Sequence, residues 1–512
     1  MNDPSSASGI EMVNGTASQI RLADIMLRRC AWVVLVLASV GLLASSIYRA
    51  ATFPFTHDES LSFAIFNWDP RWWGTANNHL LNTFLMQCFS ASFGNSELVL
   101  RLPNLLAHGI YLICVLLLLR RLEHPLLRIA GFVLLNLNPF LLDFFFLARG
   151  YGLALAFLIL SLYLLTRAYE EKQQQGFPRY LYLAVAAGAL AVLANFAFLN
   201  YYLPLLLASA WLLLSDASLR RFSRGHLSQA VALFSAGGFF LALVLYKIIR
   251  LQRSGQLYFG GHEGFVSDTV GSLVRCSLYS GSSTATTETV LSTILSCLFA
   301  GLLLLSLSLC FLRREVPLCT LFSLILASAV TLPILQHHLV SALFPIERAA
   351  LYYLPLYAVT LLFAFDSLGR LSRHHWQKLM ILLLPVAMAA VLTWHFFLCF
   401  TLHGCYWASG RHDPEVLELV NQDRELTFPG RTVRIGNSWL MEPSLNFYRI
   451  TRHYTWLAPV TRAPISGADD DYIYTFEGEV KDAAIGRFTR LASYPDTQTV
   501  LLRIDRVQGG GP

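Results

Sequence analysis

Charge is scarce in this sequence. Only 14% of its 512 residues are Asp, Glu, Lys or Arg, whereas 55% are hydrophobic; an ordinary soluble domain has about 25% charged residues. The apolar residues form separate runs without charge, many of them near the roughly 20 residues that cross a bilayer as a helix. The composition excludes an ordinary soluble protein and predicts a mainly α, polytopic membrane protein. Its net charge of +6 then reflects membrane topology, and we expect membrane lipids but no nucleic acid as partners.

Sequence signals of other protein classes are also missing. None of the nine cysteines forms a CxxC metal or redox motif, and most lie inside apolar runs, where a small buried side chain is expected. No repeat of the solenoid type is present. The first 20 residues are polar and rich in small side chains, which is not the pattern of a signal peptide. We therefore expect residues 1–28 to form a disordered cytoplasmic tail and the first span to remain in the membrane.

About eleven transmembrane helices are predicted from charge-free length and flanking basic residues. They cover approximately residues 30–48, 102–119, 127–142, 150–166, 180–198, 200–214, 228–249, 289–312, 316–335, 349–365 and 379–400. The run from 180 to 215 contains no charge, and it holds two short spans only if the chain turns between Asn195 and Asn200. The predicted transmembrane domain covers residues 29–400.

The Lys and Arg residues provide an independent test of this count, because they concentrate in cytoplasmic loops. With a cytoplasmic N-terminus, every predicted inside segment is basic; these are Arg28–Arg29, Arg120–Arg121 with Arg128, Arg167 with Lys172 and Arg179, Arg220–Arg221 with Arg224, Arg313–Arg314, and Arg370 with Arg373 and Lys378. The outer face then receives residues 49–101, 143–149, 250–288, 336–348 and the C-terminal segment. We predict a multi-pass protein of the inner (plasma) membrane with its polar loops outside the cytoplasm.

Charge returns after residue 400. Residues 401–512 contain 14 acidic and 12 basic side chains, which is typical of a folded domain outside the membrane. An amphipathic helix is predicted from Asp413 to Asp423, and the stretches TVRIGN, DYIYTF and TVLLRI have the short, β-rich pattern of strands. We predict a small extracytoplasmic (periplasmic) α/β domain that helps to bind an acceptor or covers the site.

The sequence His57-Asp58-Glu59 places three titratable side chains just beyond the first span. In the same loop, ESLSFAIFNW and NHLLNTFLMQCF have apolar residues at helical spacing, which predicts two interfacial helices. Carboxylates are favoured in the first turn of a helix, so the two acids have an ordinary explanation as capping residues. A catalytic explanation is favoured by other polar residues on the same predicted face, namely His79, Arg101, Arg149 and Arg348.

In their order, these motifs resemble the bacterial membrane glycosyltransferases of the GT-C superfamily. The resemblance rests on DE after the first span, Asn78-His79, RLP at Arg101 and ARGY at Arg149 and Tyr151. The most similar groups would be the protein O-mannosyltransferases, the aminoarabinose–lipid A transferases and the RgtA-like enzymes. The likeness covers roughly residues 20–370 in layout.

The resemblance implies that a sugar is transferred with inversion from a polyprenyl-phosphate-linked donor to a hydroxyl group of an extracytoplasmic glycan, lipid or protein. It implies that Asp58 is the general base, made more basic by Glu59 and partial burial, and that Glu59 orients the acceptor, a metal or a cation. Arg149 and Arg348 would bind the phosphate of the donor. The ordinary alternative for each arginine is a side chain that extends from a helix end toward water.

Further site residues are predicted in the outer loops. In the loop 250–288, Arg253 and Tyr258 are expected to bind the donor phosphate, on a glycine-containing segment that closes over the lipid head group. The residues expected to line the site are His57, Asn78, His79, Arg101, Tyr151, His262 and Glu263.

A divalent metal is left open as a cofactor. His57, Asp58, Glu59 and His79 offer nitrogen and oxygen ligands, and His337-His338 is predicted on the same face. Adjacent residues of a helix, however, diverge by about 100° and do not converge on one ion.

Two other classes of protein remain as alternatives. A transporter or flippase would also be polytopic, but it would place ionisable residues near mid-membrane, whereas here they gather at span ends. A non-catalytic scaffold for envelope assembly is suggested by the C-terminal domain.

Overall fold

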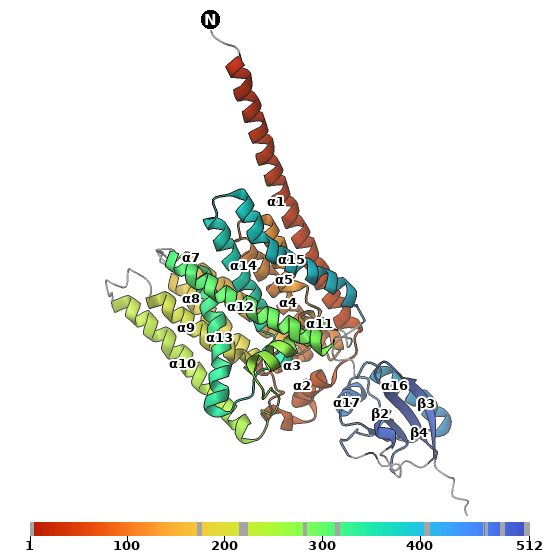
Figure 1. The fold of residues 1–512 in the computed structure, drawn as a ribbon. Helices are drawn as coiled ribbons and strands as arrows, with labels where there is room; N and C mark the ends of the chain where they lie inside the picture. The colour runs from red at the N-terminus through yellow and green to blue at the C-terminus, as the bar shows by residue number, and fades with distance from the viewer. Residues whose placement is uncertain are drawn as a thin grey trace, which may run out of the picture.

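The computed structural model describes residues 5–171, 177–214, 224–279, 284–312, 318–403, 410–463, 465, 469–481 and 487–505. The chain forms a helical bundle with a small α/β domain packed at one end (Figure 1). We call this end of the bundle the domain end.

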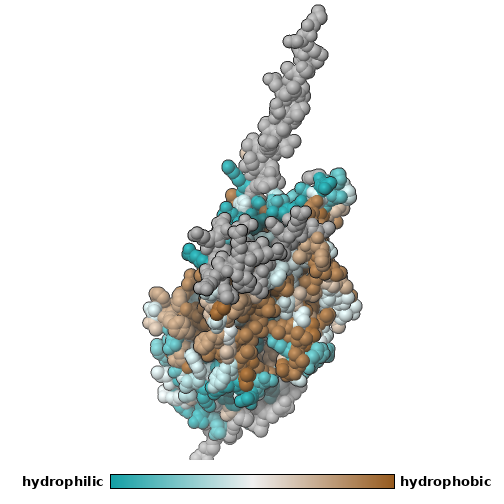
Figure 2. All heavy atoms as spheres, turned by 90° about the vertical axis from the view of Figure 1, so that its left-hand side faces the viewer, coloured by the Kyte–Doolittle hydropathy of each residue, from teal (hydrophilic) through white to brown (hydrophobic). Residues whose placement is uncertain are grey.

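Long apolar helices make up the bundle. They are α1 (Ser5–Thr52), α4 (Glu97–Leu119), α5 (Pro125–Asn136), α6 (Pro139–Phe146), α7 (Gly150–Glu170), α8 (Phe177–Ala194), α9 (Leu199–Leu214), α10 (Arg224–Arg253), α12 (Ala285–Leu312), α13 (Leu318–Val340), α14 (Tyr353–Leu371) and α15 (His375–Cys399). Across the face seen in Figure 2, hydrophobic side chains form a band with hydrophilic residues above and below it. This is the surface of a multi-pass membrane protein.

The described helices account for nine or ten of the about eleven predicted spans, and a shorter apolar helix matches the remaining one. In the described residues, nine helices are long and apolar enough to cross a membrane, and α5 with α6 forms a broken span bent by 62°. The break falls before Pro139, which lacks the N–H that a continuous helix would need. The shorter apolar helix α8 completes the set, and Asn195, with the 3-10 turn η2 (Phe196–Phe198), divides the run 180–215 into α8 and α9 as expected.

The N-terminal segment differs from its prediction. Residues 5–28 were expected to be a disordered tail, but α1 is continuous from Ser5 to Thr52. Extending an existing helix avoids the unfavourable nucleation step, so a span can propagate its helix into a polar flank.

The loop between α1 and α4 contains both predicted helices. These are α2 (His57–Asn67) and α3 (Leu80–Phe93), and the 3-10 turn η1 (Pro70–Gly74) lies between them. The long loop after α10 is mostly helical in its described part, with the π-helix η4 (Phe265–Val270) and α11 (Gly271–Leu278). Another 3-10 turn, η5 (Glu347–Ala350), precedes α14.

The C-terminal domain is the predicted α/β module. It contains α16 (Asp413–Thr427), β1 (Ile435–Asn437), α17 (Glu442–Thr451), β2 (Tyr472–Phe476), the short turn η6 (Glu479–Lys481), β3 (Phe488–Tyr494) and β4 (Thr499–Ile504). The strand order is β1-β2-β4-β3, with β1 parallel to β2 and the other pairs antiparallel. The helix at Asp413 and the three predicted strands are confirmed; α17 and β3 were not predicted.

The C-terminal domain packs on α2 through aromatic side chains. Phe447 of α17 stacks on Phe55, with ring centroids 4.2 Å apart, and contacts Phe63 edge-on at 5.1 Å. The Tyr448 hydroxyl accepts a hydrogen bond from the Phe55 backbone N–H at 2.7 Å. These buried contacts place the domain beside the sequence His57-Asp58-Glu59.

A close approach between the backbones of α7 and α8 leads to a first prediction. A Cβ at Gly150 would lie 1.8 Å from the Ala194 carbonyl oxygen and 2.9 Å from the His79 Cβ. We expect Gly150→Ala to lower the free energy of unfolding by about 1–3 kcal/mol or more, because the backbones cannot separate without disturbing both helices. Thermal unfolding of the purified protein measures the effect. Gly109→Ala is the matched control, since its Cβ meets no atom within 4 Å; an equal loss in both variants would contradict the prediction.

Candidate active site

The start of α2 is fixed by a capping box. The Thr56 hydroxyl accepts a hydrogen bond from the Glu59 N–H, and a Glu59 carboxylate oxygen accepts one from the Thr56 N–H at 2.9 Å. This reciprocal pair satisfies two backbone donors that a helix start leaves open. Asp58, between them in sequence, is left with its side chain free to point elsewhere.

Glu59 forms a fully buried ion pair with Arg101 of α4. The Arg101 Nε and Nη2 atoms donate to the two Glu59 carboxylate oxygens at 2.8 and 2.7 Å. Arg101 also donates to the carbonyl oxygens of Ala50, Phe53 and Pro54 at 2.6–3.0 Å. All five guanidinium N–H groups therefore have acceptors, and the arginine caps the C-terminal end of α1.

The same carboxylate holds the chain before α7. Glu59 Oε1 also accepts a hydrogen bond from the Ala148 backbone N–H at 2.6 Å, the fourth that the carboxylate accepts. The ion pair thus ties together the end of α1, the start of α2, α4 and the loop that carries Arg149. This geometry corrects our expectation of direct roles for two residues: Glu59 and Arg101 have no exposed polar atom to offer an acceptor or metal, and they act as positioning residues.

Asp58 lies between two arginines at the domain end. Its Oδ2 atom is 3.1 Å from Arg149 Nη2 and 3.5 Å from Arg348 Nη1. The Arg149 side chain is 4% exposed, whereas those of Asp58 and Arg348 are each 21% exposed. The Asp58 carboxylate and the Arg348 guanidinium are therefore partly accessible from outside the fold, whereas Arg149 is nearly enclosed.

Backbone geometry sets both arginines in place. Arg149 is the N-cap residue of α7 in an extended conformation, and its Nη1 also donates to the Asp58 carbonyl oxygen at 3.1 Å. Arg348 follows Glu347, whose φ of 48° is left-handed and is held by a hydrogen bond of 2.8 Å from its N–H to the Ser272 hydroxyl. A non-glycine residue in this region is strained, which is typical of a position fixed by its surroundings.

The arginines make Asp58 a weak base. Burial alone would raise the pKa of its carboxyl, but the charges of Arg149 and Arg348 outweigh burial and lower the pKa to about 2. The expected increase in basicity from Glu59 is therefore wrong, because the Glu59 carboxylate is neutralised by Arg101.

His79 and Tyr151 form the inner wall beside this cluster. The two rings meet edge-on with centroids 5.2 Å apart, and His79 is 5% exposed. Burial, and then the charge of Arg149, lower the pKa of His79 well below its usual value, so the ring is neutral. Within the described chain, His79 Nε2 has no hydrogen-bond partner. Asn78, in contrast, is occupied by Thr83 and the Trp73 carbonyl and does not line the opening.

The glycine-containing loop reaches the cluster through a residue that we did not predict. The Arg348 guanidinium lies over the Phe259 ring at 5.0 Å. Gly261 and Phe344 pair across the two loops through backbone hydrogen bonds of 2.9 Å. The donor ligands and site residues predicted in this loop lie on the surface: Arg253, His262 and Glu263 are exposed, and Tyr258 is 75% exposed. The sequence signal that could have identified Phe259 is its position between Tyr258 and the two glycines Gly260 and Gly261.

His57 connects the cluster to the C-terminal domain. Its Nδ1 atom is 2.7 Å from the Leu440 carbonyl oxygen, and its ring meets Trp439 edge-on at 5.5 Å. Burial is the largest influence on the His57 imidazole and lowers its pKa. Among the described residues, no group of three or more His, Cys, Asp or Glu side chains is arranged to hold a metal ion; His57, Asp58 and Glu59 point to three different partners.

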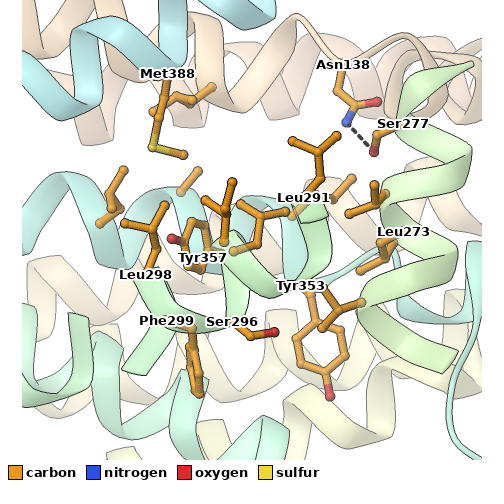
Figure 3. Close-up of a pocket in the computed structure, with 18 of the residues that line it drawn as sticks. Asn138, Leu273, Ser277, Leu291, Ser296, Leu298, Phe299, Tyr353, Tyr357 and Met388 are labelled. Atoms are coloured by element: carbon orange, nitrogen blue, oxygen red, sulfur yellow. Dashed lines mark hydrogen bonds between the residues drawn. The ribbon is translucent and has the colours of Figure 1, made fainter. Parts of the chain in front are cut away.

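An apolar cavity of about 780 Å³ lies inside the bundle. Its walls come mainly from η4, α11, α12, α14 and α15; η4 follows the segment bearing Phe259, and α14 follows the one bearing Arg348. Figure 3 shows Leu, Phe, Tyr and Met side chains around it and one polar contact, in which the Asn138 amide donates to the Ser277 hydroxyl at 2.9 Å. Such a lining fits a hydrocarbon ligand.

Known proteins resemble both the sequence and the fold. Residues 77–246 match the family described as dolichyl-phosphate-mannose-protein mannosyltransferase. A comparison with curated proteins gives no match by sequence.

Among solved structures, the fold is similar to that of ArnT from Cupriavidus metallidurans in the apo state, with a TM-score of 0.53 and 12% identity over 93% of this chain and 98% of that one. The structure of the same ArnT bound to undecaprenyl phosphate gives a TM-score of 0.51 and 12% identity over 94% and 99% of the two chains. The match to this family covers about a third of the chain, and the likeness to ArnT, at 12% identity, is one of fold; the predicted polytopic GT-C-like fold is confirmed.

The buried pair makes a second prediction. Glu59→Gln leaves the Arg101 charge buried with a neutral partner, and we expect it to lower the free energy of unfolding by about 3–5 kcal/mol. Glu477→Gln is the control, because the Glu477–Arg490 pair is about half-exposed, at 49% and 53%, and should contribute less than about 1 kcal/mol. Thermal unfolding in matched detergent compares the two; similar shifts would show that the buried pair is not a structural clamp.

The charge of Asp58 makes a third prediction. Because its folded pKa of about 2 lies below the ordinary value near 4, the cluster stabilises the fold above about pH 4, and this contribution is lost as the pH falls toward 2. Arg348→Gln removes one lowering charge and should raise the Asp58 pKa. Difference infrared spectroscopy measures the protonated and ionised forms of Asp58 as the pH is changed, and Asp58→Asn assigns the carboxylate band. Arg253→Gln should leave the band unchanged; a protonated Asp58 at neutral pH in the unaltered protein would refute the prediction.

Proposed function

We propose that this protein transfers a sugar from a polyprenyl-phosphate-linked donor to a hydroxyl group of an extracytoplasmic acceptor, with Asp58 as the general base. The observation that carries the proposal is the partly open Asp58 carboxylate, set 3.1 and 3.5 Å from two arginines at one end of the bundle. It combines a proton acceptor with two phosphate-binding groups.

The reaction balances with the residues of this cluster. The Asp58 carboxylate takes the proton of the acceptor hydroxyl as its oxygen forms a bond to the anomeric carbon. The bond from that carbon to the phosphate oxygen breaks, and polyprenyl phosphate leaves with the electron pair. Arg348 and Arg149 stabilise the negative charge that develops on the phosphate. Attack opposite the leaving group inverts the anomeric configuration.

The apolar cavity supports a lipid-linked donor. Its lining elements η4 and α14 follow the segments bearing Phe259 and Arg348 in the chain, and we propose that a hydrocarbon chain seated there extends toward these segments and places its phosphate at the arginines. A GT-C-type relative, ArnT, has been solved with undecaprenyl phosphate bound. The proposed orientation puts the domain end outside the cytoplasm, because basic residues mark the opposite ends of the spans.

The low pKa of Asp58 suggests that donor binding prepares the base. In the structure, both arginines direct their positive charge toward Asp58 and weaken it as a proton acceptor. A phosphate bound to the same guanidinium groups would offset that charge, and the Asp58 pKa would rise. The base would then gain proton affinity only when a donor is present for the acceptor to attack.

Asp58→Asn gives the fourth prediction. The amide is close in size but cannot accept the proton, so we expect sugar transfer to fall by about 10²- to 10⁴-fold, with expression and membrane insertion unchanged. Mass spectrometry of envelope glycans and glycolipids from cells with each variant measures the lost sugar. Asp69→Asn, in the same loop but paired with the largely exposed Arg71, is the matched control.

The same experiment separates the rival functions. Unaltered transfer by Asp58→Asn would disprove the assignment of the base. A transporter would give solute counterflow in vesicles without a new glycosidic product. A scaffold would lose its phenotype on deletion of residues 401–512 but keep it in Asp58→Asn.

A further inference from the structure

An exposed tryptophan of the C-terminal domain lies beside the active-site cluster. Trp439, in the loop between β1 and α17, is 57% exposed. Its ring nevertheless forms a T-shaped contact with the ring of His57, the neighbour of Asp58, with the ring centroids 5.5 Å apart. Leaving a large aromatic ring half in water forgoes the burial that normally stabilises it. Beside a reactive carboxylate, such a ring indicates a binding surface.

A second tryptophan, Trp72, lies near Trp439 and comes from the first loop of the bundle. Trp72 belongs to η1 in the first loop, and the Arg462 guanidinium of the C-terminal domain lies 4.8 Å from its ring and 5.8 Å from that of Trp439. The arginine thus bridges two aromatic rings from separate parts of the chain. We call Trp72, Trp439 and Arg462 the tryptophan platform.

Polar groups surround the platform and hold it. The Arg462 Nε donates to a Glu442 carboxylate oxygen at 3.2 Å, and the other Glu442 oxygen accepts from the Asn446 amide at 2.8 Å. Arg462 remains 34% exposed, so part of its guanidinium can still donate to a ligand. The surface therefore offers flat apolar faces beside hydrogen-bonding groups at fixed positions.

We propose that the tryptophan platform binds a sugar ring of the acceptor, so that the acceptor is a glycan or glycolipid head group and not a protein hydroxyl. A pyranose has one face of C–H bonds, which packs on an aromatic face, and hydroxyl groups at its edge, which meet Arg462 and Glu442. An extended peptide would need a free strand edge or a groove, and neither feature is formed by these side chains. The proposal rests on the proposed function, since it takes the Asp58 cluster as the place of transfer.

Contacts through His57 connect the tryptophan platform to Asp58. His57 joins Trp439 and the Leu440 carbonyl on one side and is the covalent neighbour of Asp58 on the other. A sugar stacked on the platform would hold the next hydroxyl of the acceptor at a set distance from the Asp58 carboxylate, which lowers the entropy cost of the attack. The C-terminal domain is then part of the acceptor site.

Saturation-transfer-difference NMR tests the platform directly. The full-length protein in lipid nanodiscs is mixed with oligosaccharides released from the envelope glycolipids of the producing cells, and its aromatic protons are irradiated. We expect saturation of sugar C–H protons, reduced about fivefold or more in Trp439→Ala and Trp72→Ala and largely restored in Trp439→Phe. The restored signal shows that the loss in Trp439→Ala is not misfolding.

The control is Trp73→Ala, because Trp73 lies in the same turn and is 52% exposed. Its signal should stay within about twofold of the unaltered protein. An equal loss in Trp73→Ala would indicate interfacial anchoring, and undiminished saturation in Trp439→Ala would overturn the platform. Saturation of a Ser/Thr-containing peptide that depends on Trp439 would also overturn it.

Asp58→Asn separates this proposal from the proposed function. The variant should bind oligosaccharide as the unaltered protein does, because stacking needs no base. If Asp58→Asn binds sugar and also transfers it normally, Asp58 is not the general base, and the tryptophan platform is unaffected. If Asp58→Asn loses transfer but sugar binding does not depend on Trp439, the tryptophan platform is refuted and the general base is not.

Discussion

The ion pair between Glu59 and Arg101 is the constraint on which the site depends. The bidentate contact is fully buried, and every guanidinium N–H has an acceptor: two donate to the Glu59 carboxylate and three to carbonyl groups at the end of α1. Burying two charges is unfavourable unless their hydrogen bonds are complete. Completing them requires α1, α2, α4 and Ala148 to meet in one geometry, and that geometry is what positions Asp58 and Arg149.

Two neighbouring carboxylates thus have opposite roles because of their surroundings. Glu59 is neutralised inside the fold, whereas Asp58, one residue earlier, faces two arginines at an opening where it is 21% exposed. Successive residues of a helix point about 100° apart, so one acid can support the scaffold while the other meets the substrate. The arginines that keep Asp58 ionised are also the groups that would receive a phosphate, so donor binding and base strength would be coupled in the proposed reaction.

The C-terminal domain contacts the Asp58 cluster from outside the bundle, through His57. Phe447 and Tyr448 dock it on α2, and the same contact brings Trp439 to His57. The apolar cavity is lined by helices of the bundle and by no described residue of the C-terminal domain. A lipid-linked donor and a sugar-containing acceptor would then approach Asp58 from two chemically different directions, which fits the contrast between a hydrocarbon lining and an aromatic, polar platform.

The sequence by itself determined the membrane class, most of the spans, the two interfacial helices and most of the α/β domain, because these follow from local hydrophobic periodicity and charge. It also identified the residues that meet at Asp58, through their order along the chain. It did not separate the role of Glu59 from that of Asp58, or show that Phe259, Trp439 and Arg462 join the site while Tyr258 does not. Those distinctions depend on side-chain direction and on contacts between segments hundreds of residues apart, which only the tertiary structure decides.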